Sequence, residues 1–306
     1  MESEKKVTHF MYCPLLGLGL YGGHRGRRWL RNRIKIFKQF VIPSLKAQTS
    51  KNFILWMSVR PEDRYDNDIK ELKEYLDSIT EFTSIVTYAG VCFWDDKYPD
   101  DVAQKRLAEA VHGSLGQMFD TIGSVDHVLM TIQPSDDVYH KEFVEQIQKC
   151  FVSMPEIQAL GFRNGYVANY QTLEVSEWNP KTIPPFFTIK FPTQIFIEPT
   201  KHLSYTGPYK SHEYIADKLN FGFIETRGFL VGTHGENIST HYNHPFKGEL
   251  TPDVLRDFGL DGVEPLRLRI SIRKMIMRKL PHGWQRKLRY WFGERGYGRI
   301  YNWLRS

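Results

Sequence analysis

Short apolar runs alternate with segments of helical periodicity along the first half of the chain. Between the runs, apolar residues recur three or four positions apart, which predicts amphipathic helices. The alternation of strand and helix favours an α/β sandwich whose central sheet is mixed and mostly parallel. The predicted strands cover residues 7–13, 53–59, 84–90 and 127–132, and the predicted helices cover 29–43, 66–79, 104–122 and 142–151.

The pattern changes beyond about residue 160. Proline and aromatic residues crowd the segment 179–199, which predicts extended pieces and loops rather than helices. A short helix is predicted at 211–219. The following segment, 221–235, contains several glycines between apolar residues and predicts a hairpin.

Two adjacent carboxylates follow the predicted strand 127–132. In the sequence QPSDDVYH, Pro134 ends the strand, and Asp136 and Asp137 come directly after it. Open α/β sheets bind ligands beyond the carboxyl ends of their strands, so the pair is a candidate binding site. The alternative is that Ser135 or Asp136 caps the helix that follows.

Charge is distributed unevenly along the 306 residues. The formal net charge is +6, but the segment 266–306 holds twelve Lys or Arg residues and one acid, Glu294, and so carries +11. The first 265 residues therefore carry −5. We predict a globular domain at 1–265 and a basic tail at 266–306, and the acidic domain disfavours nucleic acid as a partner.

The tail has the pattern of an amphipathic helix. Trp284, Leu288 and Trp291 fall on one helical face, and Arg286 and Lys287 fall elsewhere. A helix of this kind binds an anionic membrane surface through its apolar and basic residues. The alternative is a C-terminal helix that packs on the first domain.

The sequence indicates a reducing compartment. Its first residues are charged, and no uninterrupted apolar segment has the length of a signal peptide or a membrane span. Cys13, Cys92 and Cys150 are odd in number and widely separated, which is typical of reduced thiols. These features predict a cytoplasmic protein with peripheral membrane association through its tail.

Three groups of residues occur in an order that resembles a known family. The first group consists of Trp29-Leu30, Arg33, Phe37, Pro43-Ser44 and Gln48-Thr49, followed by a strand. The second is the strand that ends in QPSDDVYH, and the third runs from SHEYIADKL to GFLVGTHGEN. This order, over residues 7–245, resembles the rhamnosyltransferase-like glycosyltransferases, which have the glycosyltransferase-A fold.

The chain departs from the family's pattern at two positions. Pro134 stands where the DxDD-type motif has its first acid, so that only Asp136 and Asp137 remain. His212 stands where the family has the first acid of a later dyad, which leaves Glu213 alone. The first departure bears on metal binding and the second on the identity of the base.

The resemblance implies a transferase that moves a sugar, rhamnose in the family's case, from a nucleotide-sugar donor to a hydroxyl of a glycan or a lipid-linked acceptor. It implies that Arg33 and Asp136 bind the donor. It also implies that Asp137, Asp136 and His234 hold Mg²⁺ or Mn²⁺, which prefers oxygen ligands and would act as a Lewis acid on the leaving group.

Arg28 lies near Arg33, in the glycine-rich segment 16–28. The N–H and guanidinium groups of this segment are candidates for binding the diphosphate. The alternative is that the segment is a mobile loop.

The same resemblance assigns Glu213 as the general base. A carboxylate beside the acceptor hydroxyl can accept its proton, and a single displacement then inverts the anomeric centre. The alternative is that Glu213 lies in a solvated first helical turn capped by Ser211. For His234 the alternative is a structural histidine, and His241 and His244 are further candidates for a metal site.

Two other functions stay open at this point. One is a non-catalytic protein that binds glycan or membrane on the same fold. The other is a metallohydrolase with a site built from His234, His241 and His244, although the chain has no HExxH motif. An alternative acidic site lies in the sequence WDDKYPDD, at residues 94–101.

Overall fold

The computed structural model describes residues 7–15, 26–89, 112–117, 119–206, 212–235, 237 and 252–268. The chain divides into two compact units, Met1–Leu266 and Arg267–Ser306. The helices and strands described below belong to the first unit. The helix predicted for the basic tail lies outside the described residues, and so do residues 104–111 and 118 of the helix predicted at 104–122.

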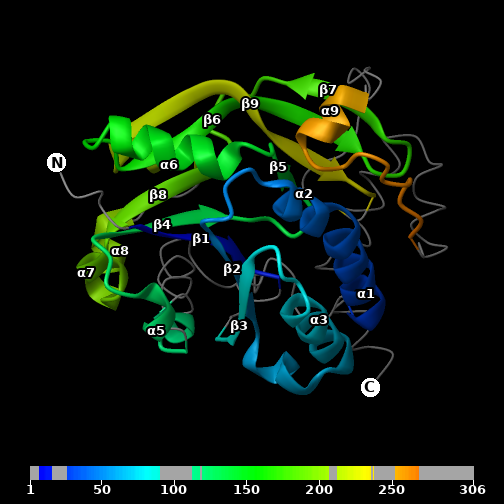
Figure 1. Cartoon of the computed structure of the whole chain (residues 1–306), viewed down its shortest axis with the longest axis horizontal. Helices are drawn as coiled ribbons and strands as arrows, with labels where there is room; N and C mark the ends of the chain where they lie inside the picture. Colours follow the sequence, from blue (N-terminus) through cyan, green and yellow to red (C-terminus); the bar gives the residue numbers. More distant parts are fainter. Residues whose placement is uncertain are drawn as a thin grey trace, which may run out of the picture. The chain divides into compact units, whose positions relative to one another are not determined.

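In the described part of the chain, nine strands form one sheet (Figure 1). The sheet order is β3-β2-β1-β4-β8-β6-β9-β5, and β7 pairs with β6 outside this path. The strands are β1 (Val7–Cys13), β2 (Ile54–Val59), β3 (Thr83–Tyr88), β4 (His127–Ile132), β5 (Val138–Tyr139), β6 (Ala159–Asn169), β7 (Glu174–Trp178), β8 (Phe187–Pro192) and β9 (Phe221–Thr233).

The pairings show that most strands run in one direction. β1 pairs in parallel with β2 and β4, β2 with β3, and β6 with β9. β8 runs antiparallel between β4 and β6, and the partners of β5 and β7 are also antiparallel. Thus only β5, β7 and β8 oppose the other strands, which confirms the predicted α/β class with a mixed, mostly parallel sheet.

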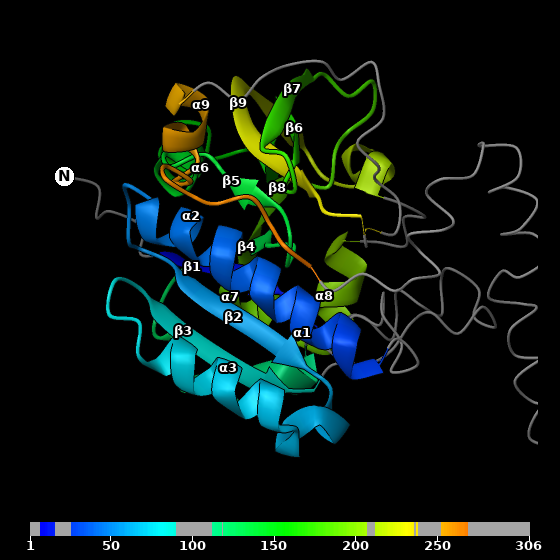
Figure 2. The same cartoon turned by 90° about the vertical axis from the view of Figure 1, so that its right-hand side faces the viewer.

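Helices cover both faces of the sheet. Figures 1 and 2 show α1, α2 and α3 on one face of β1–β4 and α5, α7 and α8 on the other. Side chains alternate along β1, so Phe10 and Tyr12 pack in a core with Trp56 and Phe196 on the second face. The helical segments are α1 (Gly26–Ile36), η2 (Phe37–Val41), α2 (Ile42–Ala47), η3 (Pro61–Tyr65), α3 (Asn67–Asp77), α5 (Phe119–Ile122), α6 (Phe143–Ser153), α7 (Thr193–Phe196), α8 (Pro199–Thr206), η4 (His212–Asp217) and α9 (Pro252–Asp257).

The first helix continues through Pro43, so the prediction that it ends there is wrong. One π-helical turn, η2, lies between α1 and α2, and the Ile42 N–H donates to the Phe37 carbonyl five residues back. A proline in an α-helix loses a hydrogen bond and meets the carbonyl four residues earlier. The wider π turn immediately before α2 relieves that contact, so the helix continues to Ala47.

The segment 221–235 is not a hairpin. Residues Phe221–Thr233 form the single strand β9, which pairs in parallel with β6. Gly228 is needed for close packing rather than for a turn, because a Cβ there would lie 2.0 Å from the Phe162 ring. The predicted extended segment also contains a helical turn, α7, and the predicted helix at 211–219 is the 3-10 helix η4.

No helix in the ranges that the structure describes combines the length and the apolar character needed to cross a membrane.

Candidate functional site

The acidic pair lies at a point where the sheet order reverses. β2 and β3 extend the sheet on one side of β1, and β4 lies on the other side. The Gln133 N–H donates to the Tyr12 carbonyl at 2.7 Å, which keeps β1 and β4 paired at their carboxyl ends. Asp136 and Asp137 follow directly, so they occupy the position where open α/β sheets bind ligands.

The turn that carries the pair is not a helix cap. β5 follows it, and α6 begins only at Phe143, with Glu142 in the capping position. The Gln133 side chain instead closes the turn, since its Nε2 donates to the carbonyls of Pro134 at 2.8 Å and Asp137 at 2.9 Å. The capping interpretation of Ser135 and Asp136 is therefore wrong.

Asp136 is the centre of a buried charged network. Its Oδ2 lies 2.5 Å from Arg33 Nη1 and accepts from His234 Nε2 at 3.0 Å and from Asn237 Nδ2 at 3.4 Å. The exposed fraction is 1% for the Arg33 side chain, 0% for His234 and 12% for Asp136. The structure thus brings together three predicted site residues that lie far apart in the sequence.

Each partner is held by its own element. Arg33 lies on α1, with its guanidinium 5.3 Å from the centre of the Trp29 ring. His234 follows the last residue of β9, and its N–H donates to Asn237 Oδ1 at 2.7 Å. Asn237 Nδ2 also donates to the Gly232 carbonyl at 2.7 Å, so one amide closes the turn Gly232–Asn237.

Tyr170 fixes the backbone of the acidic turn. Its hydroxyl donates to the Asp136 carbonyl at 2.9 Å, and its ring stacks on Phe40 at 3.7 Å between centroids. The Tyr170 carbonyl accepts the Leu266 N–H at 2.7 Å. Gly232 packs against the same carbonyl of Asp136, because a Cβ on Gly232 would lie 2.2 Å from that oxygen.

The two neighbouring carboxyl groups have opposite electrostatic environments. Burial favours the neutral form of Asp136, but the positive charge of Arg33 and the hydrogen bond from His234 outweigh it and lower the pKa to about 2. Burial and the negative charge of Asp136 raise the pKa of Asp137 well above its usual value. The Gly232 N–H, which donates to Asp137 Oδ1 at 2.9 Å, and the positive charge of Arg33 favour its ionised form but do not outweigh these two effects on the pKa.

Asp136 does not fit a divalent cation. Its Oδ2 already accepts hydrogen bonds from His234 and Asn237, and a cation beside it would meet the positive charge of the Arg33 guanidinium. Within the described ranges, no group of three or more His, Cys, Asp or Glu side chains is placed to hold a metal ion. The charge of Asp136 is met by Arg33, and the metal-binding role of Asp137 stays a prediction.

No protein-family model and no curated protein matches the chain. Among solved structures, it is similar to a "putative nucleotide-diphospho-sugar transferase" from Desulfovibrio desulfuricans G20. The sequence identity is 11% and the TM-score is 0.37, and the similarity covers 83% of this chain and 95% of that one. Similarity at this level does not assign a function.

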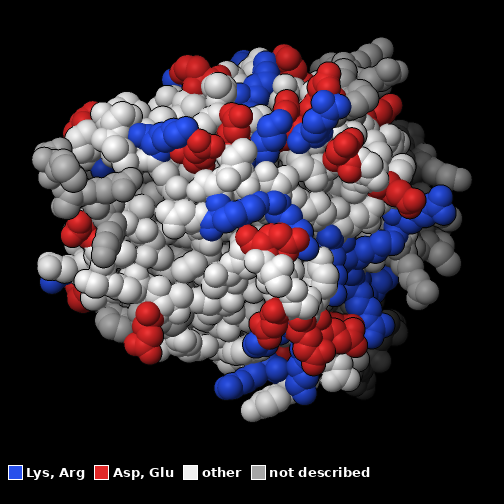
Figure 3. Space-filling model, viewed as in Figure 1, with Lys and Arg blue, Asp and Glu red and all other residues white. Residues whose placement is uncertain are grey.

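The structure places the other predicted residues outside this network. Glu213 lies on η4, is exposed, and accepts from Thr182 Oγ1 at 2.9 Å. Arg28 is exposed on the first part of α1. Together with Arg31 and Lys35 it belongs to a basic strip along α1, which Figure 3 shows beside acidic side chains.

Some predicted residues lie outside the described ranges. These are His241 and His244, the acidic loop at 94–101 and the glycine-rich segment 16–25. The two histidines are the ones that a histidine-rich hydrolase would add to His234.

Three residues of the network were not predicted from the sequence. Gly232 and Asn237 flank His234 in the pattern G-x-H-x-x-N, and this short spacing is the signal that could have found them. Tyr170 follows β6 in a segment without any motif, so no local signal indicates its contact with Asp136.

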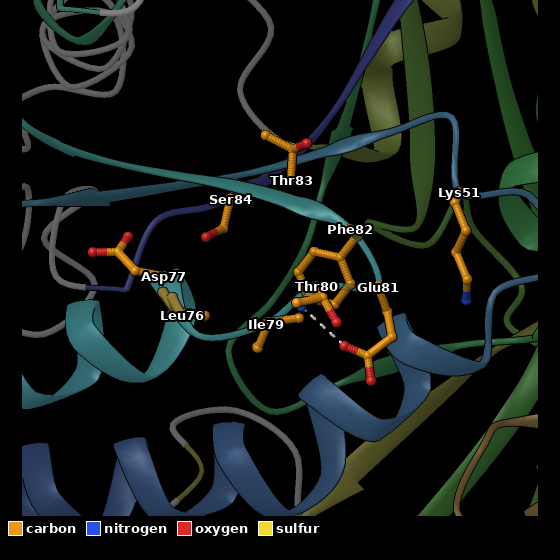
Figure 4. Close-up of a pocket in the computed structure, with 9 residues that line it drawn as sticks. All are labelled: Lys51, Leu76, Asp77, Ile79, Thr80, Glu81, Phe82, Thr83 and Ser84. Atoms are coloured by element: carbon orange, nitrogen blue, oxygen red, sulfur yellow. Dashed lines mark hydrogen bonds between the residues drawn. The ribbon is translucent and has the colours of Figure 1, made fainter.

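A pocket of about 500 Å³ lies elsewhere, at the start of β3 (Figure 4). Leu76, Ile79 and Phe82 line it together with Lys51 and Glu81. Because it lies at the amino end of β3, it is at the opposite edge of the parallel strands from Asp136. None of the predicted site residues lines it, so we place the candidate site at the carboxyl ends of β1 and β4.

Proposed function

We propose that this protein is a glycosyltransferase that takes its sugar from a nucleotide-sugar donor. The observation that carries the proposal is the acidic turn after β4, at the reversal of strand order, joined to Arg33 and His234 from distant segments. Nucleotides bind at this position in open α/β sheets. The order of motifs along the chain supports the same function by its resemblance to the rhamnosyltransferase-like family.

The donor would contact the exposed side of the acidic turn. Asp137 is only partly buried, and one of its oxygens binds the Gly232 N–H. A carboxyl group at this position can accept hydrogen bonds from the hydroxyls of a sugar or a ribose. Arg28, exposed near the start of α1, would attract the diphosphate.

Glu213 would act as the base. Its exposed carboxylate can accept the proton of an acceptor hydroxyl as that oxygen attacks the anomeric carbon. The bond from the anomeric carbon to the diphosphate breaks in the same displacement, and the configuration inverts. We include a glycan or lipid-linked acceptor in the proposal, with an anionic membrane surface contacted by residues 266–306.

Calorimetry with a panel of nucleoside diphosphates tests this function directly. We expect one of UDP, GDP, CDP or dTDP to bind, and Asp137→Ala to weaken that binding about tenfold or more. Asp137→Asn keeps the acceptor for the Gly232 N–H and serves as the matched variant. This variant removes the carboxyl group but keeps the hydrogen bond that holds the turn, so it shows which of the two losses weakens nucleotide binding.

Glu213→Gln supplies the catalytic control. It should bind the same nucleotide with unchanged affinity while transfer from the matching nucleotide-sugar falls by about 100-fold or more. A wild-type protein that binds none of the four nucleotides would contradict the proposed function.

A further inference from the structure

We propose that Asp136 is a positioning residue neutralised by Arg33, and that the donor site binds its nucleoside diphosphate without a divalent cation on Asp136. The second half rests on the proposed function. The first half depends only on the contacts of Asp136.

The hydrogen bonds at Asp136 exclude a cation from Oδ2. A carboxylate oxygen offers about two lone-pair directions, and this one accepts hydrogen bonds from His234 Nε2 and Asn237 Nδ2. The Arg33 guanidinium adds a positive charge 2.5 Å away. Because the carboxylate accepts, His234 Nε2 must carry the proton in this bond. That nitrogen therefore cannot be a metal ligand while the bond exists.

The burial of Arg33 and His234 limits how these side chains can affect a bound donor. Arg33 and His234 have side chains that are 1% and 0% exposed, so they do not reach a ligand in solution. Both nevertheless meet one oxygen of Asp136, at the turn that also carries Asp137. Their effect on a bound donor must pass through this turn.

The path from Asp136 to the donor-contacting side can be followed bond by bond. Asn237 Nδ2 donates both to Asp136 Oδ2 and to the Gly232 carbonyl. The Gly232 N–H then donates to Asp137 Oδ1. Asp136 thus fixes the turn Gly232–Asn237, and this turn fixes the carboxyl group of Asp137.

The charge of Arg33 takes the place of a cation at Asp136. A divalent cation compensates carboxylates that would otherwise repel each other, whereas here a permanent guanidinium charge already lies 2.5 Å from Asp136. A buried ion pair is strongly destabilised when one partner is removed, because the other charge stays buried and unpaired. Removal of a metal ligand from a metal-free protein has no such cost.

Thermal unfolding in EDTA tests whether Arg33 neutralises Asp136. We expect Asp136→Ala to lower Tm by about 5–10 °C. The double variant Asp136→Ala/Arg33→Met should recover part of this loss, because it removes both charges. If Asp136→Ala leaves Tm unchanged or raises it, Asp136 is not the partner of a buried charge and the proposal fails.

Calorimetric titrations test whether the donor binds without a cation on Asp136 and whether Asp136 has a positioning role. Mn²⁺ alone should not bind to the protein at Asp136, so Asp136→Asn and wild type should give the same Mn²⁺ titration. The nucleoside diphosphate should bind wild type with the same affinity, within about twofold, in EDTA and in excess Mn²⁺. Asp136→Asn, which retains one acceptor oxygen, should lose less nucleotide affinity than Asp136→Ala.

A gain of about tenfold in nucleotide affinity from Mn²⁺, present in wild type and absent in Asp136→Ala, would overturn the cation-free site. Equal affinities for Asp136→Asn, Asp136→Ala and wild type would overturn the positioning role. A protein that binds no nucleotide in either buffer contradicts the proposed function instead, and the unfolding temperatures still decide whether Asp136 pairs with Arg33.

Discussion

Two buried histidines of this protein, His9 and His234, have opposite surroundings. His9 lies within β1, where its Nε2 pairs with Thr131 Oγ1 at 2.8 Å, and Thr131 Oγ1 lies 2.5 Å from Thr188 Oγ1. His234 follows β9 and pairs with a carboxylate that also holds a guanidinium. One network contains only neutral partners, and the other contains two full charges.

The two networks show how structural polar groups differ from candidate functional ones in this sheet. Burial lowers the pKa of His9 to about 3, so the imidazole stays neutral and its hydrogen bonds satisfy it within the core. A buried ion pair costs more to assemble and rarely adds stability over an apolar substitute. A charged network at the carboxyl ends of the strands therefore supports the proposed role in donor binding.

The largest expected effect comes from breaking the charged network. Arg33→Met leaves the buried carboxylate of Asp136 without its counter-charge, and the free energy of unfolding should fall by about 4 kcal/mol. Arg31→Met is the matched control on the same helix, because the Arg31 side chain is 62% exposed and pairs with Asp68 at 3.0 Å. Its cost should stay below about 1 kcal/mol in urea denaturation. Equal costs for the two variants would remove the distinction between these arginines.

The next effect is a pH dependence carried by the neutral network. The folded-state pKa of His9 lies below its unfolded value of 6.5, so its contribution to stability is present above pH 6.5 and is lost as the pH falls toward 3. Between pH 6.5 and 4 this loss should reach about 3 kcal/mol. Urea denaturation at several pH values should show a shallower acid loss for His9→Gln than for wild type.

The comparison with wild type isolates His9 from other groups that titrate in this range. His202, whose pKa burial lowers to about 4, should leave a residual loss in the variant. Asp137 acts in the opposite direction, because its raised pKa makes folding less favourable as the pH rises. Parallel curves for wild type and variant would show that His9 is not buried in its neutral form.

The smallest effect tests how closely the turn of His234 packs on the acidic turn. Gly232→Ala places a Cβ 2.2 Å from the Asp136 carbonyl and 2.3 Å from the Tyr170 ring. We expect a loss of about 2 kcal/mol in unfolding free energy from this crowding. Gly116→Ala is the control, since the nearest atom to its Cβ would lie 3.8 Å away, and its effect should be close to zero. A harmless Gly232→Ala would show that the two turns can separate.

Local pattern predicted the first part of the fold well. β1 occupies the predicted residues 7–13, β4 the predicted residues 127–132, and α3 lies within the predicted helix 66–79. Alternating apolar residues and helical spacing are properties of a few consecutive residues, so they can be seen without knowledge of the fold. The continuation through Pro43 was missed because it depends on a π turn, which has no such local pattern.

The sequence predicted three residues of the network but not the contacts between them. Arg33, Asp136 and His234 were singled out, but the prediction gave Arg33 to the donor and placed a metal ion at Asp136 and His234. Their pairing depends on α1, β4 and β9 meeting at one edge of the sheet, and residues 33 and 234 are separated by most of the domain. Tyr170 could not be predicted, since its role arises only where the end of β6 meets the acidic turn.

The π turn at Phe37–Val41 also sets the phase of the first helix. Arg33 lies before this turn and Phe40 within it, and both must face the acidic turn, one through its charge and the other through Tyr170. Each residue of an α-helix advances the side chains by about 100°. The wider π turn advances by a smaller angle per residue, so its five residues wind through about the same angle as four α-helical residues. Deletion of one residue between 37 and 41 would therefore restore an ordinary α-helix and leave Arg33 close to its present phase relative to α2. A relative with a one-residue gap at this point would keep its counter-charge opposite the acidic turn.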